Sequence, residues 1–406
     1  MISDRVKASL KREFKTSRMA QLGLILVLLV IIVATFAPFF ALHDPTEQRI
    51  GTGDGVDDDD AGVIGDNGVE EDDDDDIDPG DIDDADEADE AESTDRTDVP
   101  PLSPIPGHQF VGETEEIQRV DHEDGTFDIE IVETEVNADR AFPLGTNTVG
   151  QDIYSRIVYG ARISMLVGIL GAGLAALVGV PYGLAAGYFG GRLDDGLMRG
   201  ADVMLAFPSL VLAIALVGVF RDSGFHTTQL PDPFVLAAQS DTVPNVLIPR
   251  ADHVAAMPES ITFPVTVTLV VALVNWVWFA RIARGEAISI RTEEYVKAAR
   301  SLGASHTRIL RQHVLPNAIT PIIVLATIQV AFIILLEAAL SFLGFSGTNL
   351  TWGADVESGR GDLATSWWIS TMPGIAIVIA VIGVNLIGDW LRDALDPGIE
   401  GESGGM

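Results

Sequence analysis

The sequence predicts an all-α polytopic membrane protein with six transmembrane helices and an acidic, largely disordered extracellular insert. Two features support this fold class. Six apolar stretches are each close to the roughly 20 residues that a helix needs to cross a bilayer, and almost all of the net charge falls in one segment. Helices of soluble cores are rarely apolar on all sides, which argues against six buried helices of a soluble protein.

The six predicted spans are nearly free of charged residues. They cover residues 22–40, 163–189, 203–220, 261–280, 318–343 and 369–388. The first span follows a basic tail, 1–20, as the core of a signal peptide would. Its apolar run is longer than the core of about 7–15 residues that signal peptides have, and a poor cleavage site follows it. We therefore expect a retained helix over 21–42.

The charge of the chain is distributed very unevenly. The whole chain has 25 Lys+Arg and 60 Asp+Glu, a formal charge of −35, although 47% of its residues are hydrophobic. Residues 43–140 contain 37 acidic and 4 basic residues, which places −33 of that charge in one insert. This balance argues against nucleic acid as a partner, because phosphate neutralisation needs clustered Lys and Arg. The lack of Cys excludes disulfides, zinc-thiolate sites and thiol catalysis.

The acidic insert carries uninterrupted acidic runs at 57–60 and 70–76. Such runs repel themselves and have little apolar surface to bury, so 51–100 is predicted to be disordered. A calcium site would need ligands and a glycine at EF-hand spacing, and no such spacing occurs. Weak alternation of apolar and acidic residues over 110–136 predicts a small exposed strand or hairpin. High acid content with only four lysines resembles the composition of proteins from salt-loving microbes.

Orientation follows from the basic residues near the ends of the spans. The tail 1–20 and the loop 281–313, which has seven basic and three acidic residues, are both expected in the cytoplasm. Six spans then place the C-terminal tail, 398–406, in the cytoplasm and the insert outside the cell. Arg156 and Arg162 are on the outer side of the second span, against the rule. The second span is rich in Gly and Ala, which permits close helix packing. Two interpretations of these small residues remain open, tight packing alone or a bundle whose helices slide.

The segment 291–317, "RTEEYVKAARSLGASHTRILRQHVLPN", predicts two short helices at an angle. Thr292 is a candidate N-cap for the first helix, and Gly303 is a candidate C-cap. Ser305 is a candidate N-cap for the second, which we expect to end at Pro316. Helical spacing puts four residues on one face of the first helix: Tyr295, Ala298, Ala299 and Leu302. Such a unit either inserts into a groove on a partner or lies on the membrane surface.

The segment "EYVKAARSLGAS" followed by "LPN" resembles the EAA loop of binding-protein-dependent ABC importer permeases. Three further segments, "PLGTNTVGQDIYSRIVYGARISMLVG", "EAALSFLGF" and "NLIGDWLRDALDP", resemble the second permease subunit of dipeptide, oligopeptide and nickel importers. The resemblance covers residues 142–397 and the first span. It implies the type I permease fold over a transmembrane domain at 141–397, with a cytoplasmic coupling loop at 281–317.

The resemblance also implies a division of labour. Two homologous permeases form the pathway for di- or oligopeptides, two ATP-binding-cassette ATPases bind ATP and Mg²⁺, and an extracellular substrate-binding protein delivers substrate. No lysine here follows a glycine, so a Walker A motif is impossible on this chain. We expect a non-enzymatic subunit in the plasma membrane, in contact with lipid and without its own cofactor or metal. The residues expected to couple it to the ATPase are Glu294, Tyr295, Ala298, Ala299, Arg300, Gly303, Ala304, Leu315 and Pro316.

The sequence departs from the family pattern at several places. Lys297 replaces the Glu of the E-A-A triplet, and Asn147 and Gln151 replace a usual Asp and Arg. The acidic insert is not typical, and the outer loop 221–260 is longer than usual. Asn349, with Leu350 and Thr351, forms a glycosylation acceptor pattern.

Glu337 interrupts the fifth span and is the candidate translocation residue, because a carboxylate inside the bilayer is costly. Contact with a peptide amino group, an interaction between helices, and a position at the membrane interface all remain open for it. Two other protein classes also remain. An ATP-independent secondary transporter would need matched halves with broken helices, and a membrane-anchored adhesion or surface-layer protein would not need six spans.

Overall fold

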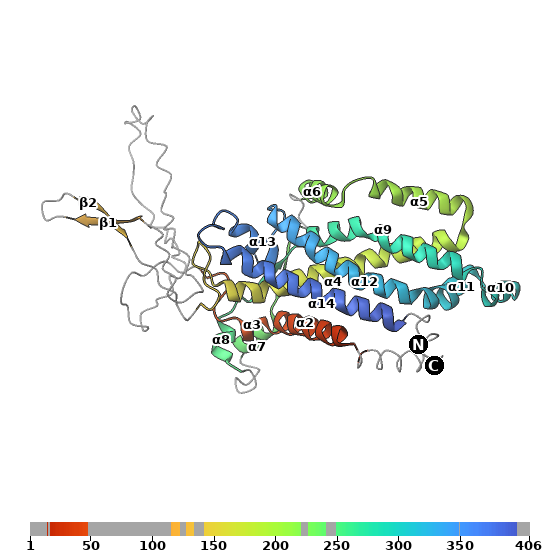
Figure 1. Ribbon diagram of the computed structural model, residues 1–406, viewed down its shortest axis with the longest axis horizontal. Helices are drawn as coiled ribbons and strands as arrows, with labels where there is room; N and C mark the ends of the chain where they lie inside the picture. Colours follow the sequence, from red (N-terminus) through yellow and green to blue (C-terminus); the bar gives the residue numbers. More distant parts are fainter. Residues whose placement is uncertain are drawn as a thin grey trace, which may run out of the picture.

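The protein is a bundle of long helices with short helices at both ends (Figure 1). The computed structural model describes residues 14, 17–47, 115–121, 127–133, 142–220, 226–240, 249–348 and 350–395. The five longest of the described helices form the bundle. They are α2 (Arg18–Thr35), α4 (Ile153–Phe189), α9 (Val265–Ile290), α12 (Leu315–Phe342) and α14 (Trp368–Leu395).

The two ends of the bundle carry different elements (Figure 1). One end, here called the basic end, carries the start of α2, the end of α14, and two short helices, α10 (Glu294–Ser301) and α11 (His306–Ile309). The opposite end, here called the insert end, carries four short helices: α3 (Ala37–Phe40), α7 (Pro233–Gln239), α8 (Ala251–Ala255) and α13 (Trp352–Ser358). The chain therefore enters α2 and leaves α14 at the end where α10 and α11 lie.

Five helices are long and apolar enough to cross a membrane, and a bent pair makes a sixth candidate span within the described residues. The pair is α5 (Gly191–Leu205) and α6 (Ser209–Phe220), which meet at 84°. The predicted span over 203–220 is therefore wrong in its bounds, because it takes in only the end of α5 together with α6. Pro208 lies in the break, where its missing N–H and its ring interrupt helical hydrogen bonding. Alone, α6 has 12 residues, or about 18 Å of helix, which is too short to span.

The helices also extend further at the basic end than the sequence predicts. Helix α9 continues to Ile290 instead of ending near 280. Helix α11, a π-helical turn η2 (Leu310–Val314) and α12 form one continuous 37-residue helix, His306–Phe342. The predicted stop at Pro316 is thus wrong, because Pro316 falls in the first turn of α12, where a helix tolerates a missing N–H donor. The predicted loop 281–317 is reduced to short connections around α10.

Tight packing between α4 and α9 organises the core. A Cβ atom added at Gly179, Gly183 or Gly187 of α4 would overlap a backbone carbonyl oxygen of α9. These glycines are spaced four residues apart, so they lie on one face and let the two backbones touch. Of the two interpretations left open for the small residues, close packing is what this arrangement shows.

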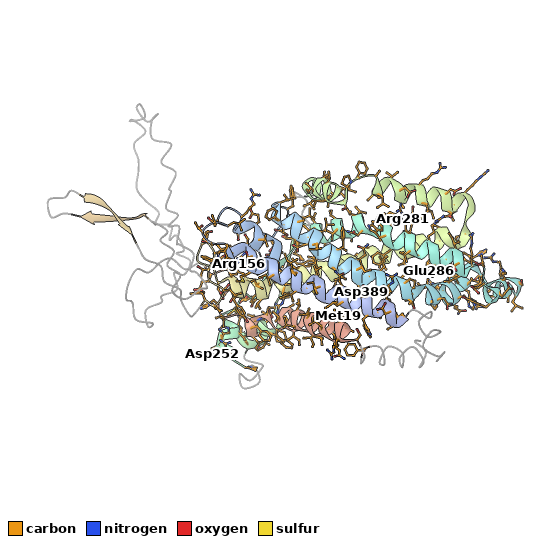
Figure 2. All side chains as sticks on the ribbon, viewed as in Figure 1. Met19, Arg156, Asp252, Arg281, Glu286 and Asp389 are labelled. Carbon is orange, nitrogen blue, oxygen red and sulfur yellow. The ribbon has the colours of Figure 1, made fainter. Side chains whose placement is uncertain are left out.

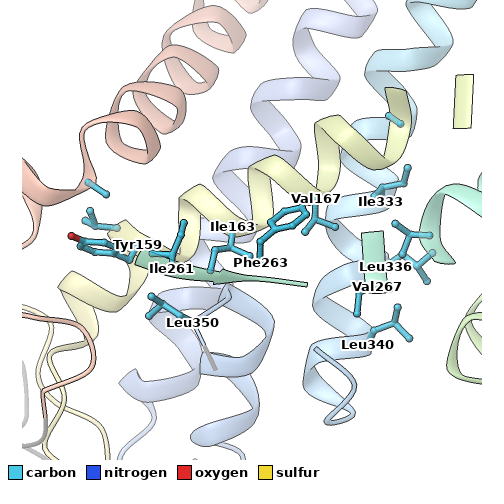
Figure 3. Close-up of a cluster of buried hydrophobic side chains, with 14 of the residues drawn as sticks. Tyr159, Ile163, Val167, Ile261, Phe263, Val267, Ile333, Leu336, Leu340 and Leu350 are labelled. Carbon is cyan, nitrogen blue, oxygen red and sulfur yellow. The ribbon is translucent and has the colours of Figure 1, made fainter. Parts of the chain in front are cut away.

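The apolar core continues from α4 to α12 toward the insert end. Figure 3 shows Ile163 and Val167 of α4 near Ile333 and Leu336 of α12, within one buried cluster. The cluster extends to α9 and to the strand β4 (Ser260–Phe263), which pairs antiparallel with β3 (Thr228–Pro231). The two strands flank the segment that carries α7 and α8 and close it into a loop.

A hairpin lies in the described part of the insert. Strands β1 (Glu115–Asp121) and β2 (Phe127–Glu133) pair antiparallel, which confirms the hairpin predicted within 110–136. Three predictions concern residues outside the described part of the chain. They are the disorder of 51–100, the tail 398–406 and the glycosylation acceptor Asn349.

Candidate functional site at the basic end

Helix α10 begins at Glu294, with Glu293 at its N-cap and no side-chain cap. The predicted cap Thr292 is wrong, because its hydroxyl instead donates to the carbonyl of Ser289 at 2.7 Å, at the end of α9. One turn into α10, the ammonium group of Lys297 lies 2.9 Å from the carboxylate of Glu294. The lysine that replaces the usual glutamate is therefore paired with a carboxylate of its own helix.

The turn after α10 confirms the prediction for Gly303. Leu302 is the C-cap, and Gly303 has φ of +81°, a left-handed conformation that favours glycine. Gly303 donates to Arg300 O at 3.0 Å and Ala304 donates to Ala299 O at 3.1 Å, the pair of bonds of a Schellman motif. Ser305 then caps α11, as predicted, by accepting from the N–H of Arg308 at 3.4 Å.

The two faces of α10 differ sharply in exposure. Val296 is fully buried, in a cluster with Ile309 of α11 and Ala283 of α9, and it anchors α10 to the bundle. Leu302 is 88% exposed and Tyr295 is 43% exposed. Ala298 is exposed and Ala299 is partly buried. The helical spacing that grouped Tyr295, Ala298, Ala299 and Leu302 on one face did not indicate that Val296 is the residue buried against the bundle.

Tyr295 has the one resolved pKa shift on α10. Burial of the phenol raises the pKa of Tyr295, and the nearby carboxylate of Glu293 raises it further. The side chain therefore stays protonated at neutral pH and presents an O–H donor at the edge of the exposed face. Its ring also lies 6.0 Å from that of His313 in η2.

The other residues expected at this site divide between the surface and the interior. Arg300 and Pro316 are exposed, whereas Ala304 and Leu315 are partly buried and pack against the cluster beneath α10. The structure thus brings Glu294, Tyr295, Ala298, Arg300 and Gly303 to one exposed unit. Ala299, Ala304 and Leu315 support that unit from inside.

The end of α4 holds α10 and α11 in place. The hydroxyl of Tyr188 lies 2.9 Å from Nδ1 of His306, the first residue of α11. The guanidinium of Arg300 lies 5.3 Å from the centre of the Tyr188 ring, in a cation–π contact. Arg291, between α9 and α10, donates to Gly187 O at 2.9 Å. Sequence reasoning did not find Tyr188, because it lies about 100 residues before its partners.

Charged pairs join α9 to α5 beside this site. Arg284 donates to both carboxylate oxygens of Asp194, at 2.6 and 2.8 Å. Arg281 pairs with Asp202 at 2.7 Å, and both side chains are exposed (Figure 2 labels Arg281). An open cavity of about 450 Å³ is lined by Arg281, Arg284, Asp202 and Met198.

At the insert end, the two arginines that break the orientation rule are paired, with Arg156 buried and Arg162 partly buried. Arg156 donates to Asp355 Oδ1 at 2.6 Å and to Gln151 Oε1 at 2.7 Å (Figure 2 labels Arg156). Arg162 pairs with Asp232 and also donates to the carbonyls of Ala34 and Thr35. Their charges are neutralised by carboxylates within the chain, so they do not act as free cations at the insert end.

Two further features of the insert end concern residues noted in the sequence. Asn147 and Gln151, which replace a usual Asp and Arg, bond to each other at 3.0 Å, so the two departures are matched. Burial raises the pKa of Asp355, while the guanidinium of Arg156 opposes the shift.

Glu337 lies in a cluster of hydroxyl groups. It is fully buried, and it accepts hydrogen bonds from Ser341 of α12 at 2.6 Å and from Ser164 of α4 at 3.2 Å. The Thr351 side chain, which caps α13, also hydrogen-bonds to this carboxylate. The geometry within this chain is that of an interaction between helices, and the role of Glu337 in translocation stays a prediction.

A bundle of long apolar helices with a pair of short helices at one end is the architecture of a polytopic membrane protein. Residues 179–401 match the family described as "Binding-protein-dependent transport system inner membrane component". Residues 10–54 match the "N-terminal TM domain of oligopeptide transport permease C". The chain belongs to the first of these families, and the resemblance, the permease fold and a multi-pass inner-membrane location are thereby confirmed.

Several named relatives share most of this region. The dipeptide transport system permease protein DppC of Alkalihalophilus pseudofirmus is 37% identical over 62% of this chain and 71% of its own length. The di/tripeptide transport system permease protein DppC of Pseudomonas aeruginosa is 33% identical over 63% and 72%. The glutathione transport system permease protein GsiD of Escherichia coli is 34% identical over 63% and 72%.

Proposed function

We propose that this chain is one of two permease subunits of an ATP-driven importer of di- or oligopeptides. Family membership supports the permease role, and the names of the relatives, which refer to dipeptides, tripeptides and glutathione, support the substrate class. The complete transporter would contain a second homologous permease, two ATPases that bind ATP and Mg²⁺, and an extracellular substrate-binding protein. The basic end would face the cytoplasm, with both termini.

The observation that carries the coupling role is the exposed apolar face of α10. Leu302 has 88% of its surface exposed although it follows a helix that Val296 anchors rigidly. Exposed apolar surface at a fixed, rimmed position marks an interaction site. We assign this face to the docking of the ATPase, with Tyr295, Ala298 and Leu302 as the apolar contacts. Glu294, Arg300 and Gly303 would form its rim and its turn.

The alternative is that α10 lies on the membrane surface. Figure 1 places α10 beyond the end of the long helices instead of along their sides. The buried side of α10 is also already occupied by the bundle, through Val296 and Ala299. Both features favour a groove on a cytoplasmic partner over a lipid surface.

Replacing Leu302 with Glu tests this assignment. The change puts a charge into the proposed interface, so we expect the ATPase to be lost when the complete complex is purified in detergent. Leu363→Glu is the matched control, because Leu363 is 52% exposed in a loop between α13 and α14, at the insert end. Retention of the ATPase by the Leu302 variant at the level of the control would contradict the assignment.

The substrate class needs a separate assay. Vesicles with the complete set of subunits should take up labelled dipeptide or oligopeptide when ATP is supplied. Uptake of nickel or another small solute in preference to every peptide would assign the importer to that substrate instead. Uptake by this chain alone without ATP would indicate a secondary transporter.

A further inference from the structure

The end of α4 is where three segments of the basic end meet. Tyr188 is 3% exposed and lies next to the last residue of α4. Its hydroxyl contacts His306 of α11 at 2.9 Å, and its ring faces Arg300 of α10 at 5.3 Å. The ring of the following residue, Phe189, lies 5.5 Å from that of His306. One side chain of α4 therefore touches both short helices of the proposed docking unit.

The chain turns sharply just after this contact. Gly190 and Gly191 have φ of +69° and +59°, so two successive glycines with positive φ form the elbow between α4 and α5. The guanidinium of Arg291 lies against Gly190 and donates to the preceding carbonyl of Gly187. Arg291, between α9 and α10, thus contacts the elbow and the residue before Tyr188.

Beyond the elbow, α5 leads to the bent element of the bundle. The carboxylate of Asp194, in the first turn of α5, is held by both guanidinium contacts from Arg284. Helix α5 then joins α6 at the 84° bend. A displacement of α10 and α11 would therefore reach α5 and α6 through Tyr188 and the elbow, which directly follow the last glycine of the α4–α9 contact, Gly187.

We propose that Tyr188 and His306 form a joint that transmits movement of α10 and α11 to the elbow between α4 and α5. The inference rests on the proposed docking of the ATPase at α10, and it adds residues that transmit the movement without touching the ATPase. Tyr188 is a positioning residue in this scheme. Its hydroxyl bond to His306 gives the joint a fixed geometry, and its ring contact with Arg300 keeps α10 and α11 moving together.

The test compares conservative variants in proteoliposomes that contain all subunits. Tyr188→Phe removes only the hydroxyl group, and His306→Leu removes the partner nitrogen. Each should lower the amount of peptide transported per ATP hydrolysed about fivefold, the size expected for loss of one hydrogen bond. His306→Asn keeps an acceptor close to the position of Nδ1 and should restore the wild-type ratio. The double variant should fall no further than either single variant, because both remove the same bond.

Tyr182→Phe is the matched control. Tyr182 lies on the same helix, and its hydroxyl donates to Leu197 O of α5 at 2.6 Å, so this variant loses an interhelical bond that does not reach α10 or α11. We expect it to keep the wild-type ratio of transport to ATP hydrolysis. An equal drop in this variant would show general loosening of α4 and α5, and would overturn the joint.

Two other results would also overturn the inference. An unchanged transport ratio in Tyr188→Phe and His306→Leu would leave the contact without a role. Loss of the ATPase from the purified complex of Tyr188→Phe would place Tyr188 in docking itself. The docking proposal fails on a different result, retention of the ATPase by Leu302→Glu, so the two failures are distinguishable.

Discussion

Arginine has opposite roles at the two ends of this molecule. At the insert end, Arg156 is buried and Arg162 partly buried, and each has a carboxylate partner from a distant part of the chain. At the basic end, Arg281 has an exposed partner and Arg300 reaches only an aromatic ring. A count of basic residues in each loop treats these arginines alike. The structure shows that Arg156 and Arg162 are neutralised by carboxylates within the protein, which a count along the sequence cannot reveal.

Apolar surface shows the same contrast. At the insert end, the carboxylate of Glu337 is sealed among hydroxyl groups, and the aromatic rings of Phe36, Phe39 and Phe234 pack on one another. At the basic end, Leu302 projects from a turn with most of its surface exposed. These groups of the insert end find their partners within the chain, whereas the exposed side chain of Leu302 fits an interaction with another protein.

The largest expected effect is at the buried ion pair. Arg156→Met leaves the carboxylate of Asp355 buried without its cation, and should lower the free energy of unfolding by about 3–5 kcal/mol. Arg281→Met removes an exposed pair and should cost at most about 1 kcal/mol. Unfolding of each purified variant in detergent measures both. Equal losses of unfolding free energy in the two variants would show that the buried and the exposed ion pairs do not differ in strength.

A smaller effect is expected where the two ends are joined, at the α4–α9 contact. Gly183→Ala forces a methyl group into the carbonyl of Ala280 and should destabilise the protein by about 1–3 kcal/mol, as overpacking does. Gly173→Ala is the control on the same helix, because no atom lies within 4 Å of its added Cβ. If both variants melted at the same temperature, close contact between α4 and α9 would be refuted.

The smallest effect is expected from deleting residues 51–100. The two ends of the insert are held together by described residues, since Ser155 Oγ accepts from the N–H groups of Leu42 and His43. The His43 ring also stacks on Phe142 at 4.6 Å. Halving the length of the connecting loop changes its closure entropy by only about 0.6 kcal/mol.

We therefore expect the deletion variant to fold with nearly unchanged stability. Measuring peptide uptake over a range of salt concentrations would then reveal any role of the acidic segment in strong brine or in capturing the binding protein. Loss of folding would show that the bundle depends on the insert. Unchanged uptake at every salt concentration would make it a passive spacer.

The sequence predicted the parts of this structure that depend on local patterns. Apolar runs located the spans, and Gly303 and Ser305 marked the turn between α10 and α11. The apolar pattern could not show that the chain divides into two helices at Pro208, because the residues next to the bend on both sides are apolar and helical. Local patterns also could not show that the helix continues through Pro316. Whether a proline ends a helix depends on the preceding turn, which here is π-helical.

Long-range partners account for the rest of what the sequence did not predict. Arg156 and Asp355 are 199 residues apart, and Tyr188 and His306 are 118 apart. No spacing rule connects such residues. The burial of Val296 and the exposure of Leu302 were hidden for the same reason, because which face of α10 meets the bundle is decided by α4, α9 and α12.

The central claim is that the basic end couples this permease to an ATPase. ATP-dependent uptake of labelled peptide tests it most directly, in vesicles that contain both permeases, both ATPases and the binding protein. The account predicts uptake that requires ATP, that is abolished by Leu302→Glu, and that is retained by Leu363→Glu. Peptide uptake by this chain alone, independent of ATP, would contradict it.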